Sequence, residues 1–157
     1  MKKRYLAWFL GLALALGWAQ ARTVFVDTTW AGLDFYPSFG LGAGIAAGVP
    51  EVIGPLSAGA SFSFHVGSWQ NAWFTGFVEY PFLKSEQGSA LARLGLGAHY
   101  GGSRFYFHTR LSAGYEWRPA FAGNVSFLTW ARVYYTFGAS RPYVYLSFGP
   151  RFYLDLK

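Results

Sequence analysis

The chain has 157 residues, of which 53% are hydrophobic, 22% aromatic and only 13% charged, and it contains no cysteine. The missing cysteines exclude a disulfide framework and a thiolate metal site. The formal net charge is +6, but three of the basic residues stand at the very start. Without them, ten basic residues face seven acidic ones, a balance too mild to predict a nucleic-acid partner.

The first segment, MKKRYLAWFLGLALALGWAQA, has the pattern of a secretory signal peptide. Three basic residues precede the apolar run 5–19, and Ala19-Gln20-Ala21 offers a small-x-small cleavage site. The alternative is an uncleaved membrane anchor, but this run of 15 residues is shorter than the 18 or more expected of a spanning helix. We therefore expect residues 1–21 to be removed and residues 22–157 to form one exported domain.

Turn-forming clusters divide residues 22–157 into short segments. Glutamate and lysine are too sparse to build solvent-facing helices, whereas aromatic residues and glycine are abundant. The expected breaks are at residues 31–32, 47–55, 67–70, 84–89, 101–103, 118–124 and 139–142. They leave eight expected strands, the first at about residues 23–30.

The side chains of these segments alternate between an apolar and a polar face. In residues 104–117, for example, Phe105, Phe107 and Leu111 share one parity, while Arg110 and Glu116 share the other. Successive residues of a strand point to opposite faces. Ten charged residues fall inside the expected strands, and all ten lie on the polar face: Asp27, Asp34, Glu79, Arg93, Arg104, Arg110, Glu116, Arg132, Arg151 and Asp155.

Two kinds of barrel have such strands. A soluble lipocalin-like barrel turns its apolar face inward, whereas an outer-membrane barrel turns it toward lipid and encloses a polar interior. Rows of aromatic side chains would overfill an eight-stranded interior, which favours the membrane. Glycine gathers on the charged face, where it makes room for large side chains: Gly40, Gly42, Gly44, Gly59, Gly95, Gly97, Gly114 and Gly149. Aromatic residues gather near strand ends, as in interfacial girdles: Trp30, Trp69, Tyr80, Phe82, Tyr100, Phe105, Tyr115, Trp117, Tyr135 and Phe137.

The last segment, SFGPRFYLDLK, carries a more specific pattern. A polar residue, a glycine two positions later and two apolar residues beyond it are Ser147, Gly149, Phe152 and Leu154. In this the chain resembles the small, mostly eight-stranded outer-membrane β-barrel proteins of diderm bacteria, although their last residue is usually aromatic and this chain ends in lysine. The resemblance implies an all-β, antiparallel, up-and-down transmembrane barrel, a monomer in outer-membrane lipid that the barrel-insertion machinery recognises through these four residues.

The polar face favours a structural role for the barrel interior over a reactive or conducting one. Charges in a narrow lumen must pair, so we expect a charge network that largely plugs the barrel, formed by Asp34, Glu79, Arg93, Arg104, Arg110, Glu116, Arg132, Arg151 and Asp155. The expected role is structural or concerned with envelope permeability. The alternative is a narrow pore whose pairs rearrange, with Glu116 pairing to Arg93, Arg104, Arg110 or Arg132.

Other chemistry is weakly supported. His65, His99 and His108 lie on the polar face of three different segments, and no ligand spacing predicts a metal site. A lipid-modifying enzyme would need a nucleophile beside a base at the lipid interface, whereas Ser63 and His65 share one strand and point into the lumen. We expect no catalytic site, no metal and no cofactor.

Overall fold

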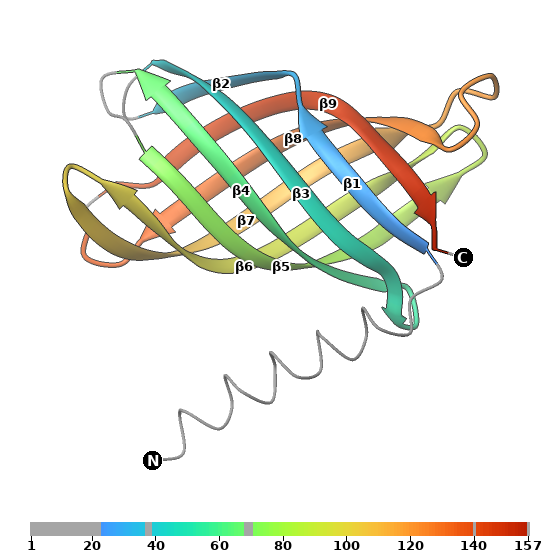
Figure 1. Ribbon diagram of the computed structural model, residues 1–157, viewed down its shortest axis with the longest axis horizontal. Helices are drawn as coiled ribbons and strands as arrows, with labels where there is room; N and C mark the ends of the chain where they lie inside the picture. Colours follow the sequence, from blue (N-terminus) through green and yellow to red (C-terminus); the bar gives the residue numbers. More distant parts are fainter. Residues whose placement is uncertain (1–22, 37–38, 68–70, 140, 157) are drawn as a thin grey trace, which may run out of the picture.

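The computed structural model describes residues 23–36, 39–67, 71–139 and 141–156, and all regular structure in these residues is antiparallel β-sheet (Figure 1). The strands are β1 (Thr23–Thr29), β2 (Ala31–Tyr36), β3 (Gly40–Ile53), β4 (Leu56–Gly67), β5 (Asn71–Ser85), β6 (Gly88–Gly101), β7 (Arg104–Trp117), β8 (Val125–Thr136) and β9 (Tyr143–Asp155). Within the described residues, no helix is long and apolar enough to span a membrane. The expected signal peptide at 1–21 lies outside the described residues.

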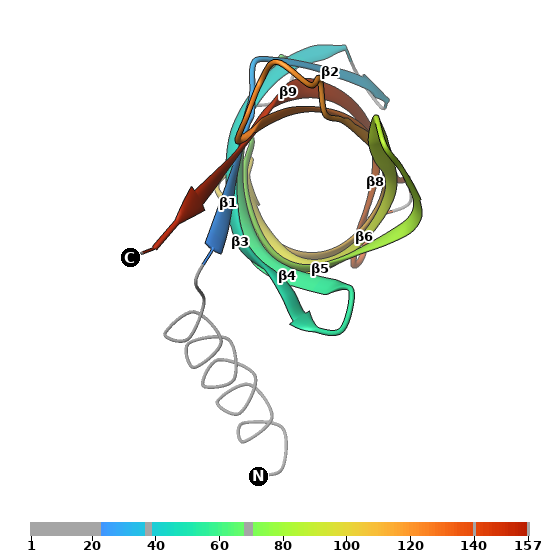
Figure 2. The same cartoon turned by 90° about the vertical axis from the view of Figure 1, so that its right-hand side faces the viewer.

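The sheet closes on itself as an eight-stranded barrel (Figure 2). β1 and β2 both pair with β3 on one side and with β9 on the other, so they are two parts of one barrel strand, here called the β1–β2 strand. The interruption is at Trp30, whose backbone N–H still donates to the carbonyl of Phe148 at 2.9 Å. Because the barrel is closed, no sheet edge exposes unpaired backbone N–H and C=O groups, for which lipid offers no hydrogen-bond partner.

The predicted turn at residues 31–32 is wrong, although the predicted number of strands is right. Gly32 does not mark a turn: a Cβ there would lie 1.8 Å from the Tyr145 hydroxyl, so the glycine makes room for a lumen side chain. The connection to β3 comes after Tyr36 instead. The sequence therefore predicted a break at residues 31–32 that does not exist and missed the break after Tyr36. The two errors cancel in the number of strands.

Two other breaks are shorter than predicted. β3 and β4 continue to a turn at residues 54–55, and β5 and β6 to a turn at residues 86–87. Thr23 at the start of β1, Asp155 at the end of β9 and the connections after β3, β5 and β7 lie at one end of the barrel, and the connections after β2, β4, β6 and β8 lie at the other (Figure 1). The strand register shifts between Pro81 and Leu83, where proline cannot donate to the ladder.

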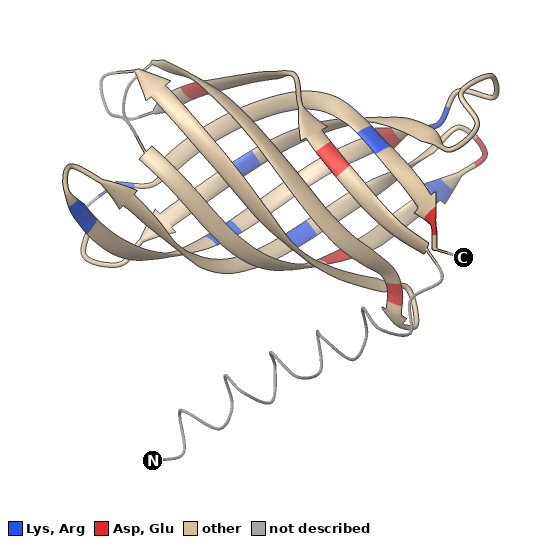
Figure 3. Ribbon diagram, in the orientation of Figure 1, with Lys and Arg blue, Asp and Glu red and all other residues tan. Residues whose placement is uncertain are grey.

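The orientation of the two faces is as predicted. Phe62, Leu94, Phe107 and Leu146 point outward with 48%, 56%, 72% and 43% of their surface exposed, whereas Arg110 and Arg132 point inward with 2% and 7% exposed. Nine of the predicted girdle aromatics are exposed on the outer surface, and Trp69 lies outside the described residues. Charged residues are spread along the barrel strands (Figure 3). Apolar groups therefore cover the cylinder, and buried charged groups lie inside it together with several large aromatic side chains.

Glycines on the inner face make the filling possible. A Cβ on Gly48 would lie 2.4 Å from the ring of Phe25, and one on Gly59 would lie 2.7 Å from the ring of Phe77. Phe25 and Phe77 are both buried in the lumen. An eight-stranded barrel has an interior only just wide enough for side chains, so each large ring is accommodated by an empty position beside it.

Candidate functional site in the barrel interior

Four charged side chains form a closed ring of ion pairs near the end of the barrel that holds the termini. We call this ring the charge belt: Asp27, Glu79, Arg93 and Arg151. Arg93 Nη2 donates to Asp27 Oδ2 and to Glu79 Oε2, each at 2.6 Å. Arg151 Nε donates to Asp27 Oδ1 at 2.6 Å, and its Nη2 donates to Glu79 Oε2 at 2.8 Å. All four side chains are buried, and two cations balance two anions.

The belt bridges the barrel from wall to wall. Asp27 is directly opposite Arg151 on the adjacent strand β9, and Glu79 is directly opposite Arg93 on β6. In the closed ring, β6 is the fourth neighbour of the β1–β2 strand in either direction, and β9 is the fourth neighbour of β5. The Asp27–Arg93 and Glu79–Arg151 contacts therefore cross the full width of the lumen. We call them the cross-lumen pairs.

Aromatic rings hold both guanidinium groups of the belt in place. Arg93 Cζ lies 4.0 Å from the ring centroid of Phe77 and 4.5 Å from that of Trp130. Arg151 Cζ lies 4.1 Å from the ring centroid of Phe25. A cation over a desolvated ring face is attracted to it by about 2 kcal/mol, so the belt is held by packing as well as by charge.

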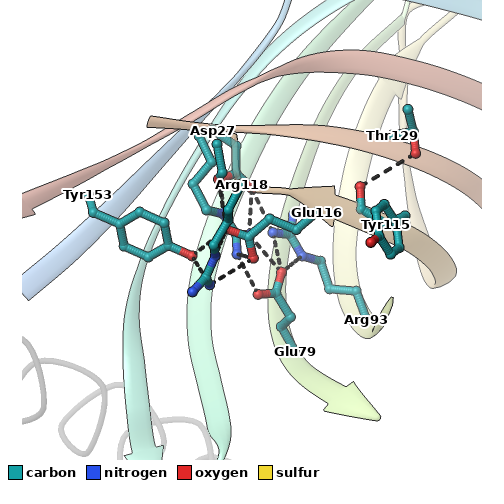
Figure 4. Close-up of polar contacts among 10 residues, drawn as sticks. Asp27, Glu79, Arg93, Tyr115, Glu116, Arg118, Thr129 and Tyr153 are labelled. Atoms are coloured by element: carbon teal, nitrogen blue, oxygen red, sulfur yellow. Dashed lines mark hydrogen bonds and ion pairs between the residues drawn. The ribbon is translucent and has the colours of Figure 1, made fainter. Parts of the chain in front are cut away.

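Glu116 belongs to a neighbouring group of contacts (Figure 4). Its Oε1 accepts hydrogen bonds from Ser126 at 2.7 Å, from the Tyr153 hydroxyl at 2.7 Å and from Arg118 Nε at 3.0 Å. Arg151 Nη1 lies 3.6 Å from Glu116 Oε2 and joins this group to the belt. In this structure Glu116 is paired with Arg118 and Arg151, and not with Arg93, Arg104, Arg110 or Arg132, the partners expected for a pore whose pairs rearrange.

Sequence reasoning missed Arg118 because it was assigned to a turn. It stands two residues after Glu116, so the two side chains leave the backbone on the same face, and that parity was the available signal. Tyr153 has the same relation to Arg151. Residues just past a strand end can fold back into the mouth of the barrel, which periodicity alone does not reveal.

Two residues of the predicted network lie at the rims of the barrel and not among its buried charges. Arg104 is the first residue of β7 and Asp155 the last of β9, and both are exposed. Asp155 accepts a hydrogen bond from the Thr23 hydroxyl at 3.0 Å. Both residues have the parity of the lumen face. Parity predicts which way a side chain points but not its position along the barrel axis, and at the ends of the barrel an inward-pointing side chain reaches solvent.

Asp34, also predicted for the network, pairs with a histidine and not with an arginine. His65 Nδ1 lies 2.9 Å from Asp34 Oδ1, and His65 Nε2 lies 3.1 Å from Ser63 Oγ. Asp34 is on β2 and the other two are on β4. Gly42 of the intervening β3 leaves the space between them, since a Cβ there would lie 3.1 Å from His65 Nδ1. All three side chains are buried.

The other two histidines are packed against aromatic and hydroxyl groups. His99 stacks on Trp73 with ring centroids 3.9 Å apart, and His108 Nε2 lies 2.9 Å from the Thr75 hydroxyl. Over the described ranges, the structure has no group of three or more histidine, cysteine, aspartate or glutamate residues placed to hold a metal ion.

Arg110 and Arg132, the remaining residues of the predicted network, lie between the belt and the histidines. Arg110 Nη1 donates to Ser61 Oγ at 2.9 Å. Among the residues that the structure describes, no ion pair includes either arginine. The predicted network is therefore several separate groups.

A hollow enters the barrel from each end. The one beside the termini has a volume of about 360 Å³ and is lined by Glu79, Glu116 and Arg151 among others. The one at the opposite end has about 840 Å³ and is lined by Trp73, His99 and Arg104 among others. The two hollows share no lining residue, and the belt stands at the inner side of the first.

The residues of the predicted assembly signal all lie on the closing strand β9. Ser147 and Gly149 face the lumen and are buried, while Leu154 is exposed. Phe152, half-buried, pairs with Val26 of β1 and with Val125 of β8. Their recognition by an insertion machinery stays a prediction.

Comparison with known proteins supports the fold. By sequence, the chain matches no protein-family model and no curated protein. By structure, it is similar to the N-terminal β-barrel domain of Pseudomonas aeruginosa OprF, with a TM-score of 0.64, 12% identity, and 85% of this chain and 98% of that chain covered. It is also similar to Neisserial surface protein A, with a TM-score of 0.61, 14% identity, and 85% and 96% covered. A designed transmembrane β-barrel has a TM-score of 0.53, 14% identity, and 86% and 98% covered.

Proposed function

We propose that this chain is an outer-membrane β-barrel protein whose lumen is closed by the charge belt, and that its role is structural. The observation that carries the proposal is the pair of contacts that cross the full width of the lumen, Asp27–Arg93 and Glu79–Arg151, each 2.6–2.8 Å long. A solute moving along the barrel axis would have to break both of them.

Closure by this belt is strong because its members are desolvated. Leaving a buried charge without its partner is costly, by about 3–5 kcal/mol where one partner is removed by substitution. Both guanidinium groups are also held over the rings of Phe77 and Phe25. Thermal motion alone would rarely separate two such contacts at once, so the resting barrel conducts nothing.

The outer membrane is the location that best fits the remaining features. The exposed apolar band requires lipid around the cylinder, and a closed β-barrel is the sheet that satisfies its own backbone there. Residues 1–21 supply an export signal, and Ser147, Gly149, Phe152 and Leu154 supply an assembly signal for the barrel-insertion machinery. The mature chain then works as a monomer in outer-membrane lipid.

Conductance measurements in planar bilayers test closure. We expect no discrete current steps from the wild-type protein, and discrete steps from a variant in which all four belt residues are alanine. The matched control replaces Arg104 and Asp155 by alanine, which removes one charge of each sign at the rims of the barrel, and should stay silent. Heat-modifiable migration on gels verifies folding of each variant before the measurement.

Two results would contradict closure by the belt. Reproducible steps from the wild-type protein would favour the alternative function, a narrow pore whose ion pairs rearrange. Silence from the folded four-alanine variant would mean that other side chains close the barrel. Co-fractionation with outer membrane tests the location, and recovery in the soluble periplasmic fraction would favour a lipocalin-like barrel.

A second candidate function has one observation in its favour, the hydrogen-bonded chain Asp34–His65–Ser63. Its order of acid, imidazole and hydroxyl is that of a hydrolase triad. All three side chains are buried, however, so a substrate has no route to the hydroxyl. We propose that these three hydrogen-bonded side chains only satisfy one another's buried polar groups. We therefore expect no labelling of Ser63 by a fluorophosphonate. Labelling that is lost in Ser63→Ala would establish the hydrolase.

A further inference from the structure

Two arginines in the middle of the barrel lie together without a carboxylate. Arg110 is on β7 and Arg132 on the adjacent β8. The residue opposite Arg110 is Tyr134, and the one opposite Arg132 is Ser112. The two arginines are thus diagonal neighbours on the inner face, about 7–8 Å apart at the backbone, and both side chains are buried.

Several donors of this pair form no hydrogen bond in the structure. Arg110 Nε, Arg110 Nη2 and Arg132 Nε are buried and have no hydrogen-bond partner in the described part of the chain. The hydroxyl groups of Ser112 and Tyr145 are in the same situation. The Tyr134 hydroxyl lies beside both guanidinium groups, but one hydroxyl oxygen has only two lone pairs and cannot accept from all three of these donors.

The acidic residues of the lumen are already in use elsewhere. Asp27 and Glu79 are bound within the belt, Glu116 is bound to Arg118, and Asp34 is bound to His65. Arginine cannot lose its proton to escape the cost of burial. An uncompensated buried guanidinium is unfavourable, and here two of them share one region. The missing negative charge has to come from solution.

We propose that Arg110 and Arg132 form a binding site for a small inorganic anion of halide size. The free guanidinium N–H groups would bind it from two sides, and the hydroxyl group of Ser112, directly opposite Arg132, would donate a further hydrogen bond. The space is small because rings surround the site: Arg110 Cζ lies 5.6 Å from the ring centroid of Phe77 and 5.8 Å from that of Tyr134, and Arg132 Cζ lies 5.3 Å from that of Tyr145. This inference holds whether the lumen is closed or conducts.

Crystals of the full mature barrel grown in sodium bromide give a direct test. We expect an anomalous bromide peak within contact distance of both guanidinium groups. A map without a peak at this position overturns the proposal, because water alone would then satisfy these donors.

Unfolding in solution gives a second, independent readout. A ligand that binds only the folded state lowers the unfolding equilibrium constant by the factor 1 + [L]/Kd, about tenfold when its concentration is ten times Kd. We expect chloride or bromide to stabilise the wild-type protein relative to gluconate and sulfate at equal ionic strength. Arg132→Met should lose this difference, and the control Arg104→Met, which removes an exposed arginine of β7, should keep it.

An equal response of the wild-type protein to halide and gluconate would contradict the site, as would equal stabilisation by sulfate or an unchanged halide effect in Arg132→Met. If Arg132→Met does not fold, the bromide map of the wild-type protein still decides.

Discussion

Replacing Arg151 by methionine should destabilise the barrel more than any other single removal of a lumen charge. Arg151 donates four hydrogen bonds to Asp27 and Glu79, at 2.6, 2.9, 3.1 and 2.8 Å, and stacks over Phe25. Without it, two buried carboxylates share the single cation of Arg93. Breaking a buried pair by removing one partner costs about 3–5 kcal/mol, and we expect a loss in that range.

A double variant separates charge from packing. Asp27→Asn combined with Arg151→Met restores a neutral belt, so we expect it to be more stable than Arg151→Met alone. Residues in such direct contact have coupling energies of about 0.5–3 kcal/mol. The measurement is urea unfolding in lipid vesicles, followed by heat-modifiable migration. Arg104→Met is the control and should change stability by about 0.5 kcal/mol or less, because Arg104 is exposed.

The reasoning is refuted if Arg151→Met is no less stable than Arg104→Met, or if the double variant is less stable than Arg151→Met. The first result would mean that the belt contributes nothing to folding. The second would mean that Asp27 is stabilising without its partner.

Further predictions concern the packed lumen and the lipid face. Gly48→Ala should destabilise by about 1–3 kcal/mol or more, because its Cβ would meet Phe25 at 2.4 Å and the Ala58 carbonyl at 2.7 Å; Gly76→Ala, whose nearest neighbour would be 3.9 Å away, is the control in the same unfolding assay. Leu111→Arg, on the outer face in the middle of β7, should cost about 2–4 kcal/mol in vesicles, whereas Phe105→Arg near the strand end should cost about 0–1 kcal/mol. Equal costs at the two positions would argue against lipid around the middle of the barrel.

Sequence alone was enough to predict which way most side chains point. Strand periodicity is strictly two, so one apolar face determines the direction of every other residue, and Arg93, Arg110 and Arg132 were placed in the interior on that basis. Closure followed from the same pattern, because a spanning sheet can leave no edge unpaired. Gly59, opposite Phe77, was also predicted as space for large lumen side chains, whereas Gly48, opposite Phe25, was assigned to the turn at residues 47–55.

The alternation of side chains led to wrong predictions in two situations. One is a glycine that can either form a turn or make room for a side chain, and the other is the end of a strand. Gly32 looked like a turn but accommodates Tyr145. Arg104 and Asp155 have lumen parity but stand at the exposed ends, while Arg118 lies beyond its strand and still reaches Glu116.

The choice of partners was decided only by the tertiary structure. Alternation states that Asp27, Glu79, Arg93 and Arg151 point inward, but not that they lie at one height. Height depends on the stagger of each strand against its neighbour around the whole ring, and it brings Arg93 to Asp27 across the barrel while leaving Arg110 and Arg132 without a carboxylate. The amino-acid sequence determines the face of each residue locally, whereas the meeting of residues on opposite walls is a property of the closed cylinder.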